Sequence, residues 1–394
     1  MVLRPIVEEE LSSAARSASL AFAVSVEDCE RWLKTAGLEH VHAYLEGEKV
    51  RSYLLRVPMG QYVRGRALSM MGVAGVTVPP EERAKGYSRS MMREALEGWR
   101  EEGFVLSTLY PSTQTLYRSV GYEQCGCLYE HTIPRGEFAG RRPRARELDV
   151  RTVTVDDPQV RALYASFASR FNGYLDRSQY IWNRIASHRG NKFEGLGCFR
   201  SDGTLSAYAF VTQVREGDGD DVSLKVRDFA YEDEEGARAV LSLCDRFTTI
   251  SQDVKFFGGP ALPILALLDQ QKFDTHRVEY TMMRVVHVER ALSQRPYPQG
   301  VRGKLALSID DDVLEANRGE YTLEVDDGVA TVTKGAQGSS APLTMHARAL
   351  APLFMGWSSA SALAHLGALS GDARSIAFAD TVFAAPPPSV PDFF

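Results

Sequence analysis

The segment 75–88 has the residue types of an anion-binding turn at the start of a helix. A β-strand pattern runs into the sequence Arg-Ala-Lys-Gly-Tyr-Ser at residues 83–88, where an amphipathic helix begins. Backbone N–H groups point outward at such a helix start, and the helix dipole adds positive potential. Gly86 lets a pyrophosphate approach the backbone without a Cβ in the way, and Arg83 and Lys85 can neutralise its charge. The pattern predicts a phosphate cradle; the plainer alternative is a helix N-terminus that follows a solvated basic turn.

The surroundings of this turn resemble those in the GNAT acyltransferases. A Val-x-Val strand precedes the turn, and Gly121-Tyr122 follows further along the chain. In that family the corresponding strand splays from its neighbour and hydrogen-bonds the pantetheine arm of coenzyme A, while the loop after it holds the pyrophosphate. The resemblance implies that Val76 and Val78 bind pantetheine through backbone atoms. It assigns the phosphate loop to Arg83, Ala84, Lys85, Gly86, Tyr87 and Ser88.

A second element of the same family matches the sequence Thr-Leu-Tyr-Arg-Ser-Val-Gly-Tyr at residues 115–122. Its first tyrosine usually faces the thioester sulfur, so the resemblance implies Tyr117 as the general acid. Amine attack on a thioester expels a thiolate, and a nearby phenol can donate a proton as that charge develops. The alternative is that Tyr117 only packs its ring and hydrogen-bonds its hydroxyl, as buried tyrosines often do.

The whole chain is similar to the Eis (enhanced intracellular survival) acetyltransferases. These join an N-terminal GNAT domain, a second GNAT-like domain that lacks the coenzyme A motif, and a C-terminal domain like sterol carrier protein. The segment 174–182 resembles the family's central domain, and 350–356 and the proline-rich tail resemble its C-terminal domain. The resemblance implies an α+β fold with two tandem GNAT-like domains, at 1–140 and 147–288, and a sterol-carrier-protein-like α/β domain at 296–394.

In that family the tail threads back to the N-terminal domain, where the chain's own α-carboxylate is regarded as the general base. The resemblance therefore implies Phe394 as the second catalytic residue. A free α-carboxyl has a pKa of about 3.3–3.7, so it is a weak base toward an ammonium group. Its expected tasks are to orient the cationic amine and to accept the proton as the C–N bond forms. The alternative is a frayed terminus, against which stand the aromatic pair Phe393-Phe394 and the stiff run Pro386–Pro388.

Three positions depart from the family pattern. Lys85 stands where many relatives have Arg and loses bidentate geometry, Ala84 adds no side-chain cation, and Val120 replaces an aromatic residue. None of these changes removes a proposed catalytic group.

Other residues have weaker claims to a role in the site. Phe22 and Trp32 fit an amine pocket, but core packing is the favoured interpretation. His131 is a possible base that an alternating strand is expected to carry to solvent. The run Asp310-Asp311-Asp312 lacks the ligand spacing of a calcium loop and predicts a solvated turn.

Hydrophobic periodicity supplies the elements that position these residues. In the first part it predicts helices at 8–23 and 86–101 and strands at 50–57, 67–78, 104–110 and 122–133. In the second it predicts a hairpin at 201–203, a strand at 222–231 and a helix at 235–250. In the last it predicts strands at 304–309 and 321–334 and helices at 346–355 and 358–366. An exposed linker is expected at 134–146 and an acidic hairpin tip at 216–221.

Composition limits the class of protein. The 394 residues include 45 Lys and Arg and 51 Asp and Glu, which gives a net charge of −6. The chain therefore lacks the surplus of basic residues that is typical of a nucleic-acid-binding protein. There is no signal-peptide pattern and no apolar run of the roughly 20 residues that span a bilayer, so we expect a cytoplasmic protein without a membrane partner. Cys125 and Cys127 are one residue apart, which suits packing better than a metal site, and no metal is expected.

The leading hypothesis is an acetyl-CoA-dependent N-acetyltransferase that acts directly on primary amines of cationic substrates. Aminoglycosides, polyamines and lysine side chains fit that description, with acetyl-CoA as cosubstrate. Two alternatives stay open: a lipid- or ligand-binding module, which predicts a continuous apolar cavity between residues 300 and 380, and a catalytically silent acyl-CoA sensor. The resemblance also implies a homo-oligomer, since family members assemble as hexamers.

Overall fold

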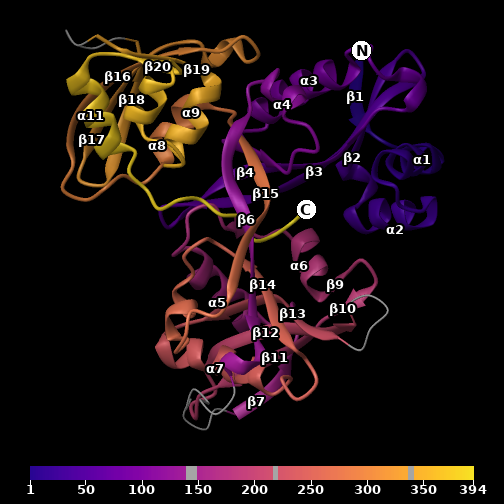
Figure 1. Cartoon of the computed structure of the whole chain (residues 1–394). Coiled ribbons are helices and arrows are strands. Elements are labelled where there is room, and N and C mark those ends of the chain that lie inside the picture. Colours follow the sequence, from indigo (N-terminus) through magenta and orange to yellow (C-terminus); the bar gives the residue numbers. More distant parts are fainter. Residues whose placement is uncertain (139–148, 216–220, 336–340) are drawn as a thin grey trace. The chain divides into compact units, whose positions relative to one another are not determined.

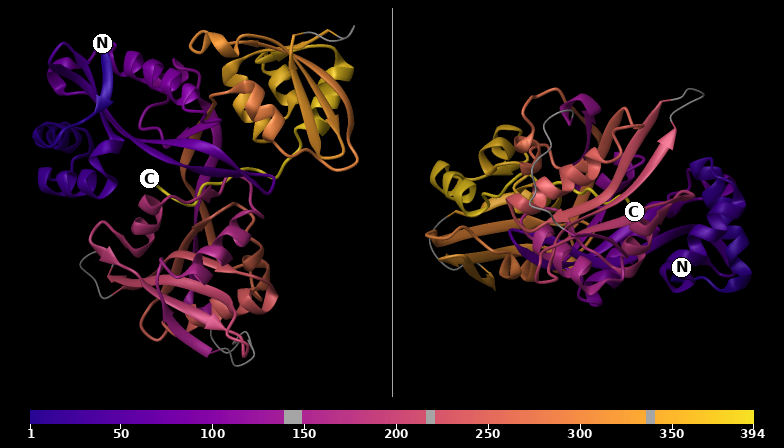
Figure 2. Two further views of the ribbon diagram at one scale, coloured as in Figure 1. Left: turned by 180° about the vertical axis from the view of Figure 1, so that it is seen from behind. Right: turned by 90° about the horizontal axis from the view of Figure 1, so that it is seen from below.

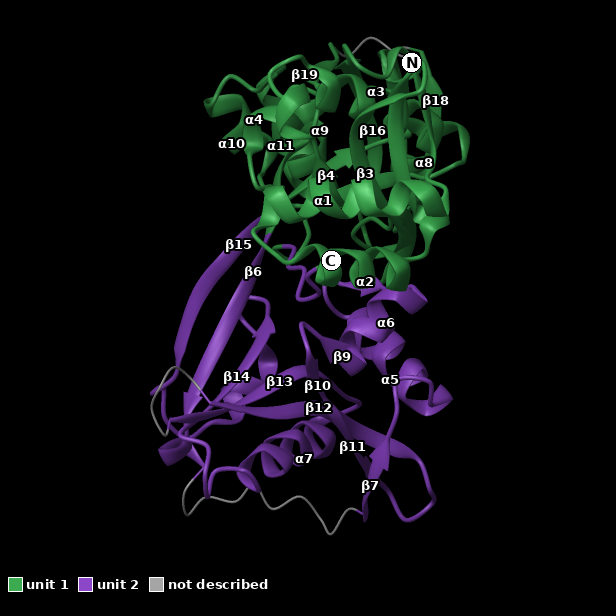
Figure 3. Ribbon diagram, turned by 90° about the vertical axis from the view of Figure 1, so that its right-hand side faces the viewer, with its two compact units in different colours: residues 1–126, 281–387, 394 green, residues 127–280, 388–393 purple. Residues whose placement is uncertain are grey.

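The computed structural model describes residues 1–138, 149–215, 221–335 and 341–394 (Figure 1). They form two compact units (Figure 3). Unit 1 contains residues 1–126, 281–387 and 394, and unit 2 contains residues 127–280 and 388–393. Most of the expected linker at 134–146 and of the expected hairpin tip at 216–221 lies outside the described residues.

The N-terminal part of unit 1 is a twisted sheet with helices on both faces. Its strands follow the order β1-β2-β3-β4-β5-β15, in which β4 and β5 pair in parallel and the other neighbours pair antiparallel. The strands are β1 (Val2–Pro5), β2 (Val41–Glu46), β3 (Lys49–Val63), β4 (Arg66–Thr77), β5 (Leu106–Leu109) and β15 (Asp274–Val285). The helices are α1 (Leu11–Phe22), α2 (Val26–Ala36), α3 (Tyr87–Glu101) and α4 (Gln114–Arg118). Figures 1 and 2 show α3 on one face of these strands and α1 and α2 on the other.

Helix α3 forms where the periodicity predicts it, because one stripe of its side chains is apolar. Met91, Met92, Leu96 and Trp99 are all 2% exposed or less. Burying each such side chain contributes about 1.5–3 kcal/mol. The helix ends before Gly103, whose φ of +91° and hydrogen bond to the Arg100 carbonyl stop it as predicted. Helix α3 begins soon after β4 and the short helix η3 (Pro80–Glu82).

The C-terminal part of unit 1 is a second, five-stranded sheet in the order β18-β17-β16-β19-β20. Its strands are β16 (Arg302–Asp310), β17 (Gly319–Asp326), β18 (Val329–Lys334), β19 (Leu343–His346) and β20 (Leu369–Ser370). Its helices are α8 (Val288–Gln294), α9 (Ala347–Phe354), α10 (Ala360–His365) and α11 (Ala373–Val382). Figure 2 shows the yellow helices of this part gathered on one face of its orange sheet. The stretch predicted as a strand at 321–334 is a hairpin, in which a turn at Asp326-Asp327-Gly328 joins β17 to β18.

Unit 2 is a mixed sheet in the order β6-β14-β13-β12-β11-β7, in which only β13 and β14 pair in parallel. Its strands are β6 (Glu123–Pro134), β7 (Asp149–Val153), β11 (Glu194–Phe199), β12 (Leu205–Arg215), β13 (Val222–Tyr231) and β14 (Asp253–Gly258). Its helices are α5 (Pro158–Ala168), α6 (Gln179–Ala186) and α7 (Glu234–Asp245). The remaining elements of unit 2 are β8 (Leu175–Asp176), β9 (Ser187–His188), β10 (Asn191–Lys192), η4 (Arg135–Glu137) and η5 (Pro263–Leu267).

Unit 1 also contains the short helices η1 (Glu8–Glu10), η2 (Leu38–His40), η3 (Pro80–Glu82) and η6 (Glu315–Asn317).

Two strands pair outside their own stretch of the chain. The last residues of β15 pair with β5 in unit 1, from Met282 opposite Leu109 to Val285 opposite Leu106. The later residues of β6 pair with β14 in unit 2, from Tyr129 opposite Gly258 to Pro134 opposite Asp253. Each unit therefore takes a strand from a distant part of the sequence.

Candidate functional site

Strand β4 has an open edge beyond the end of β5. The parallel pairing of β4 with β5 stops at Val73 opposite Leu109, whereas β4 continues to Thr77. Gly75, with a φ of +56°, lies in the stretch where the register of β4 against β3 shifts. Within the described residues, no strand covers the β5-facing edge of β4 beyond Val73. This edge suits an extended ligand that bonds to the backbone, as expected for Val76 and Val78.

The turn between β4 and α3 presents unpaired backbone amides. The short helix η3 precedes it, and Ala84 and Gly86 adopt left-handed backbone angles, with φ of +62° and +82°. Among the described residues, the N–H groups of 84–89 donate no hydrogen bond within the chain. A Cβ placed on Gly86 would meet no atom within 4 Å, so the space before the helix N-terminus is open. The left-handed conformation is uncommon for alanine and costs about 1–2 kcal/mol of conformational free energy. Ala84 adopts it beside this open space.

The buried carboxylate of Glu82, just before the turn, forms ion pairs with three cationic side chains. The Glu82 side chain is 2% exposed and pairs with Lys49 at 2.5 Å, Arg51 at 2.8 Å and Lys85 at 3.0 Å. The ammonium groups of Lys49 and Lys85 hold the pKa of Glu82 down to about 2. Lys85 also donates to the Glu81 carbonyl at 2.9 Å. Lys85 therefore braces the turn, a role that its position in the motif did not reveal.

Arg83 is a second exposed cation of the loop, beside Lys85. Its Nε donates to the Val78 carbonyl at 3.2 Å. The Val78 carbonyl thus has a partner inside the loop, which leaves the Val78 N–H as the backbone group available to a ligand. Tyr87 and Ser88, at the start of α3, are half-buried.

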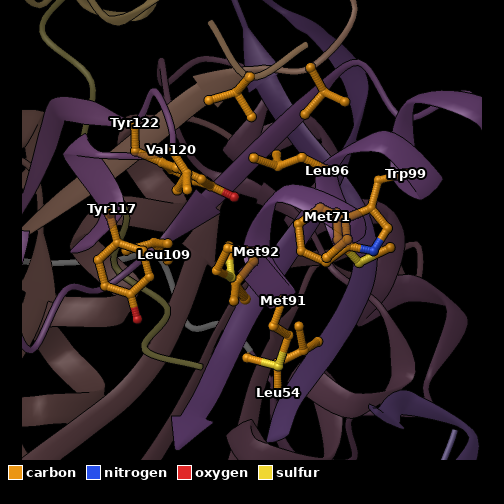
Figure 4. Close-up of a cluster of buried hydrophobic side chains, with 14 of the residues drawn as sticks. Leu54, Met71, Met91, Met92, Leu96, Trp99, Leu109, Tyr117, Val120 and Tyr122 are labelled. Atoms are coloured by element: carbon orange, nitrogen blue, oxygen red, sulfur yellow. The ribbon is translucent and has the colours of Figure 1, made fainter. Parts of the chain in front are cut away.

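Tyr117 lies in α4 and belongs to a hydrophobic cluster of unit 1 (Figure 4), which also contains Val73 and Leu109. Its ring meets that of Tyr122 edge to face, with centroids 6.0 Å apart. The Tyr122 hydroxyl is bonded to Ser107 Oγ at 2.7 Å, whereas the Tyr117 hydroxyl points away from the cluster in Figure 4. Burial raises the pKa of Tyr117 to about 12, so its phenol is protonated at neutral pH. The packing and proton-donor interpretations of Tyr117 are therefore compatible.

Phe394 is ordered against the strands that carry the site. The residue is 6% exposed, and its ring meets that of Tyr110 edge to face at 5.6 Å. Its Cε2 lies 3.0 Å from where a Cβ on Gly72 would stand. Gly72 pairs with Thr108 in the last part of the β4–β5 ladder, and Tyr110 directly follows β5. Phe394 thus lies where β4 and β5 part, which contradicts the alternative of a frayed terminus.

The same hydrophobic cluster unites several of the predicted residues. Val76 and Tyr87 pack against the cluster that contains Tyr117. The open edge of β4, the start of α3 and Tyr117 therefore all border one hydrophobic cluster.

Three weaker expectations are wrong. His131 is fully buried rather than solvated: its ring nitrogens bond to Thr275 and to the Gly259 carbonyl, and burial lowers its pKa. The solvated turn expected at 310–312 is wrong for Asp311, which forms a buried ion pair with Arg284 at 2.7 Å, whereas Asp310 and Asp312 are exposed. Phe22 is not core: it is 40% exposed and meets Trp32 edge to face at 6.1 Å.

Cys125 and Cys127 are both buried, in agreement with a packing role. Over the described ranges, no group of three or more His, Cys, Asp or Glu residues is placed to hold a metal ion. In the same ranges, no helix has the length and apolar character needed to cross a membrane.

Comparisons with known proteins assign the three parts of the chain. One family model for an acetyltransferase (GNAT) domain matches residues 2–125, and another matches residues 173–285. A model for a sterol carrier protein domain matches residues 288–391.

Known relatives agree with this assignment. A GCN5-related N-acetyltransferase from Anabaena variabilis is 28% identical over 100% of both chains, with a TM-score of 0.92. Eis1 from Mycobacterium abscessus is 16% identical over 100% of both chains, with a TM-score of 0.77, a likeness of fold. A UPF0039 protein from Schizosaccharomyces pombe is 42% identical over 72 residues, which are 17% of this chain and 47% of that protein. The chain thus spans about half the length of this curated relative.

These matches confirm the predicted α+β fold class. They also confirm the predicted enzyme class, a GNAT acetyltransferase, at the level of the domains. The chain carries two GNAT acetyltransferase domains followed by a sterol carrier protein domain.

Proposed function

We propose that this chain is an acetyl-CoA-dependent N-acetyltransferase that transfers acetyl directly to a primary amine. The observation that carries the proposal is the row of unpaired amides at residues 84–89, at the N-terminus of the 15-residue helix α3. Such a row, with the helix dipole behind it, favours phosphate oxygens. The open space at Gly86 is where those oxygens would approach.

Acetyl-CoA supplies an acyl group already activated as a thioester. The backbone of Val76 and the N–H of Val78 would hold its pantetheine arm along the open edge of β4. The residues that would hold its pyrophosphate are Arg83, Ala84, Lys85, Gly86, Tyr87 and Ser88. Among them, Arg83 would supply the mobile positive charge, while Lys85 keeps the turn in place through Glu82.

Tyr117 is the proposed general acid. With a pKa of about 12, it holds its proton at neutral pH and can donate it as negative charge develops on a leaving sulfur. The low polarity of its surroundings strengthens that hydrogen bond, because little water competes for it.

Phe394 is the proposed partner of the amine. Its place between Gly72 and Tyr110 supports a carboxylate near the gap between β4 and β5. There the carboxylate would orient a cationic amine and accept the proton that nitrogen loses as the C–N bond forms. This acceptor chemistry fits aminoglycosides, polyamines and lysine side chains, and the arrangement is that of an Eis-type enzyme.

A panel assay tests the proposal. The chain is incubated with acetyl-CoA and, in separate reactions, an aminoglycoside, spermidine and a lysine peptide. Free thiol is followed over time, and acetylated product is identified by mass. We expect amine-dependent thiol release for at least one acceptor and its loss when Phe394 is deleted. Release no faster than in the amine-free blank for every amine contradicts the function, and a near-normal rate after the deletion removes the tail from the mechanism.

A groove in unit 1 bears on the lipid-binding alternative. It has a volume of about 700 Å³ and is lined by apolar residues such as Trp357 and Leu366. Arg118, Glu123 and Arg348 also line it, so its wall is partly charged rather than continuously apolar. This lining favours the acetyltransferase over the lipid carrier. A cytoplasmic location and a homohexamer stay predictions, the second to be measured by light scattering.

A further inference from the structure

The turn that follows Tyr117 fixes the backbone of that residue. The N–H groups of Val120 and Tyr122 donate to the Tyr117 carbonyl at 3.1 and 3.0 Å. Gly121, between them, has a φ of +85°. A shift of Gly121 would therefore also shift the backbone of Tyr117, through these two hydrogen bonds.

Arg284, from β15, lies directly against this glycine. Its Nη1 donates to the Gly121 carbonyl at 3.2 Å. A Cβ on Gly121 would fall 1.8 Å from the same nitrogen, so the guanidinium occupies the space that glycine leaves. The Arg284 side chain is 0% exposed, which leaves it no freedom to move into solvent.

Asp311 holds the guanidinium in this position. Both of its carboxylate oxygens accept from Arg284 Nη2 at 2.7 Å. The carboxylate is itself fixed by the N–H groups of Val313 and Leu314, at 3.0 and 2.9 Å, and by Asn317 at 3.2 Å. Charge-assisted bonds of this kind are short and directional. Asp311 belongs to the region that matches a sterol carrier protein domain.

We propose that Arg284 is a positioning residue for Tyr117, and that Asp311 holds the Arg284 guanidinium in place. The sterol carrier protein domain then contributes to acetyl transfer by holding the tyrosine turn in place. This inference rests on the proposed function, because it needs Tyr117 to act as the general acid. Burying an ion pair costs desolvation free energy, so the pair adds little net stability. A role in fixing one geometry of the tyrosine turn explains why this chain buries the pair of Arg284 and Asp311.

A double-mutant cycle tests the inference in the full chain. Asp311→Asn keeps the shape of the side chain and removes its charge. It is made in the wild-type background and in Tyr117→Phe, and kcat and the acetyl-CoA Kd are measured for each. We expect kcat to fall about tenfold to a hundredfold in the wild-type background and less than about twofold in Tyr117→Phe. We expect the acetyl-CoA Kd to stay the same, because the partners of Asp311 are Arg284, Asn317 and the N–H groups of 313 and 314 rather than the turn at 83–88.

A second pair of variants covers the case in which Asp311→Asn does not fold. Arg284→Gln combined with Asp311→Asn removes both buried charges together and is put through the same cycle. Arg302→Gln with Asp326→Asn is the matched control, since that ion pair lies in the same domain with side chains 73% and 72% exposed. The control should leave kcat unchanged in both backgrounds.

The outcomes separate the positioning role from the proposed function. Equal losses of kcat in the two backgrounds, or no loss in either, overturn the positioning role and leave Tyr117 as the acid. A Tyr117→Phe variant with wild-type kcat overturns the acid itself, and the positioning role with it. A loss confined to the background that retains the tyrosine hydroxyl supports the inference.

Discussion

Lys85 and Glu82 form an ion pair in the turn before α3, with Nζ and Oε2 3.0 Å apart. The lysine stands where the family pattern places a phosphate-binding cation, yet it is bound to a carboxylate that is 2% exposed. Glu82 therefore links Lys85, in the loop, to Lys49 and Arg51 of β3. The charge that meets an incoming anion falls mainly to Arg83 and to the helix itself.

Replacing Glu82 is expected to make the loop less stable in a pH-dependent way. The folded pKa of about 2 lies below the ordinary value of 4.5, so the stabilisation is complete above pH 4.5 and is lost as the pH falls toward 2. Glu82→Gln should lower Tm by an amount that is constant between pH 7 and 5 and shrinks below pH 4. Thermal scans across this range check it. Glu81→Gln is the control, because its exposed carboxylate pairs only loosely with Arg16 at 3.5 Å. A gap that widens in acid contradicts the assignment.

Gly86→Ala is expected to weaken coenzyme A binding. The new Cβ enters the open face of the cradle, and the φ of +82° adds about 1–2 kcal/mol of strain. Titration calorimetry should show a Kd raised about tenfold or more. Gly47→Ala supplies a matched test of strain alone, since Gly47 has a φ of +61° and nothing within 4 Å. If Gly47→Ala weakened binding as much, the effect would not belong to the cradle.

Tyr117→Phe is expected to lower kcat about a hundredfold while the coenzyme A Kd stays constant. Because the pKa of Tyr117 is about 12, loss of its proton should not limit the wild-type rate below about pH 11. Steady-state kinetics over pH 6 to 10 check both statements. Tyr122→Phe removes the neighbouring hydroxyl, which bonds to Ser107, and should cost about 1 kcal/mol of stability with kcat retained. Equal kinetic losses in the two variants would point to packing rather than proton transfer.

Gly121→Ala is expected to be strongly destabilising. Its Cβ would collide with the buried Arg284 guanidinium and force apart the pair with Asp311, a change that costs about 3–5 kcal/mol. Thermal unfolding should show Tm lowered by several degrees. Gly98→Ala, in the middle of α3 with nothing within 4 Å, should leave Tm unchanged or raise it slightly. An unchanged Tm for Gly121→Ala would mean that the turn yields easily.

Local patterns in the sequence predicted much of this fold. The spacing of Met91, Met92, Leu96 and Trp99 indicated α3, and Gly103 marked its end, because both signals lie within the element itself. The predicted helix at 235–250 ends earlier, at Asp245, where tight turns take over. Helix α2 was not predicted, although Ser25 caps it and Gly37 ends it, the usual boundary signals.

Long-range partners explain what the sequence could not reveal about the site. Glu82 and Asp311 look like solvated acids in their local sequence, and only the fold brings Arg51 and Arg284 to them. His131 is similar, because its partners Thr275 and Gly259 come from distant segments. The motifs single out the loop at 83–88 and Tyr117 as site residues, which stays a prediction, whereas the buried ion pairs of Glu82 and Asp311 depend on tertiary structure.

The exchange of β15 and β6 between stretches of the chain has a consequence for biosynthesis. A ribosome must deliver nearly three quarters of the polypeptide before Met282 can pair with Leu109 and finish the N-terminal sheet. Until then, β5 offers an uncovered edge, which is the kind of surface that promotes aggregation. A gene fragment that stops after the first GNAT region should therefore yield insoluble protein. The domains should be expressed together as one polypeptide.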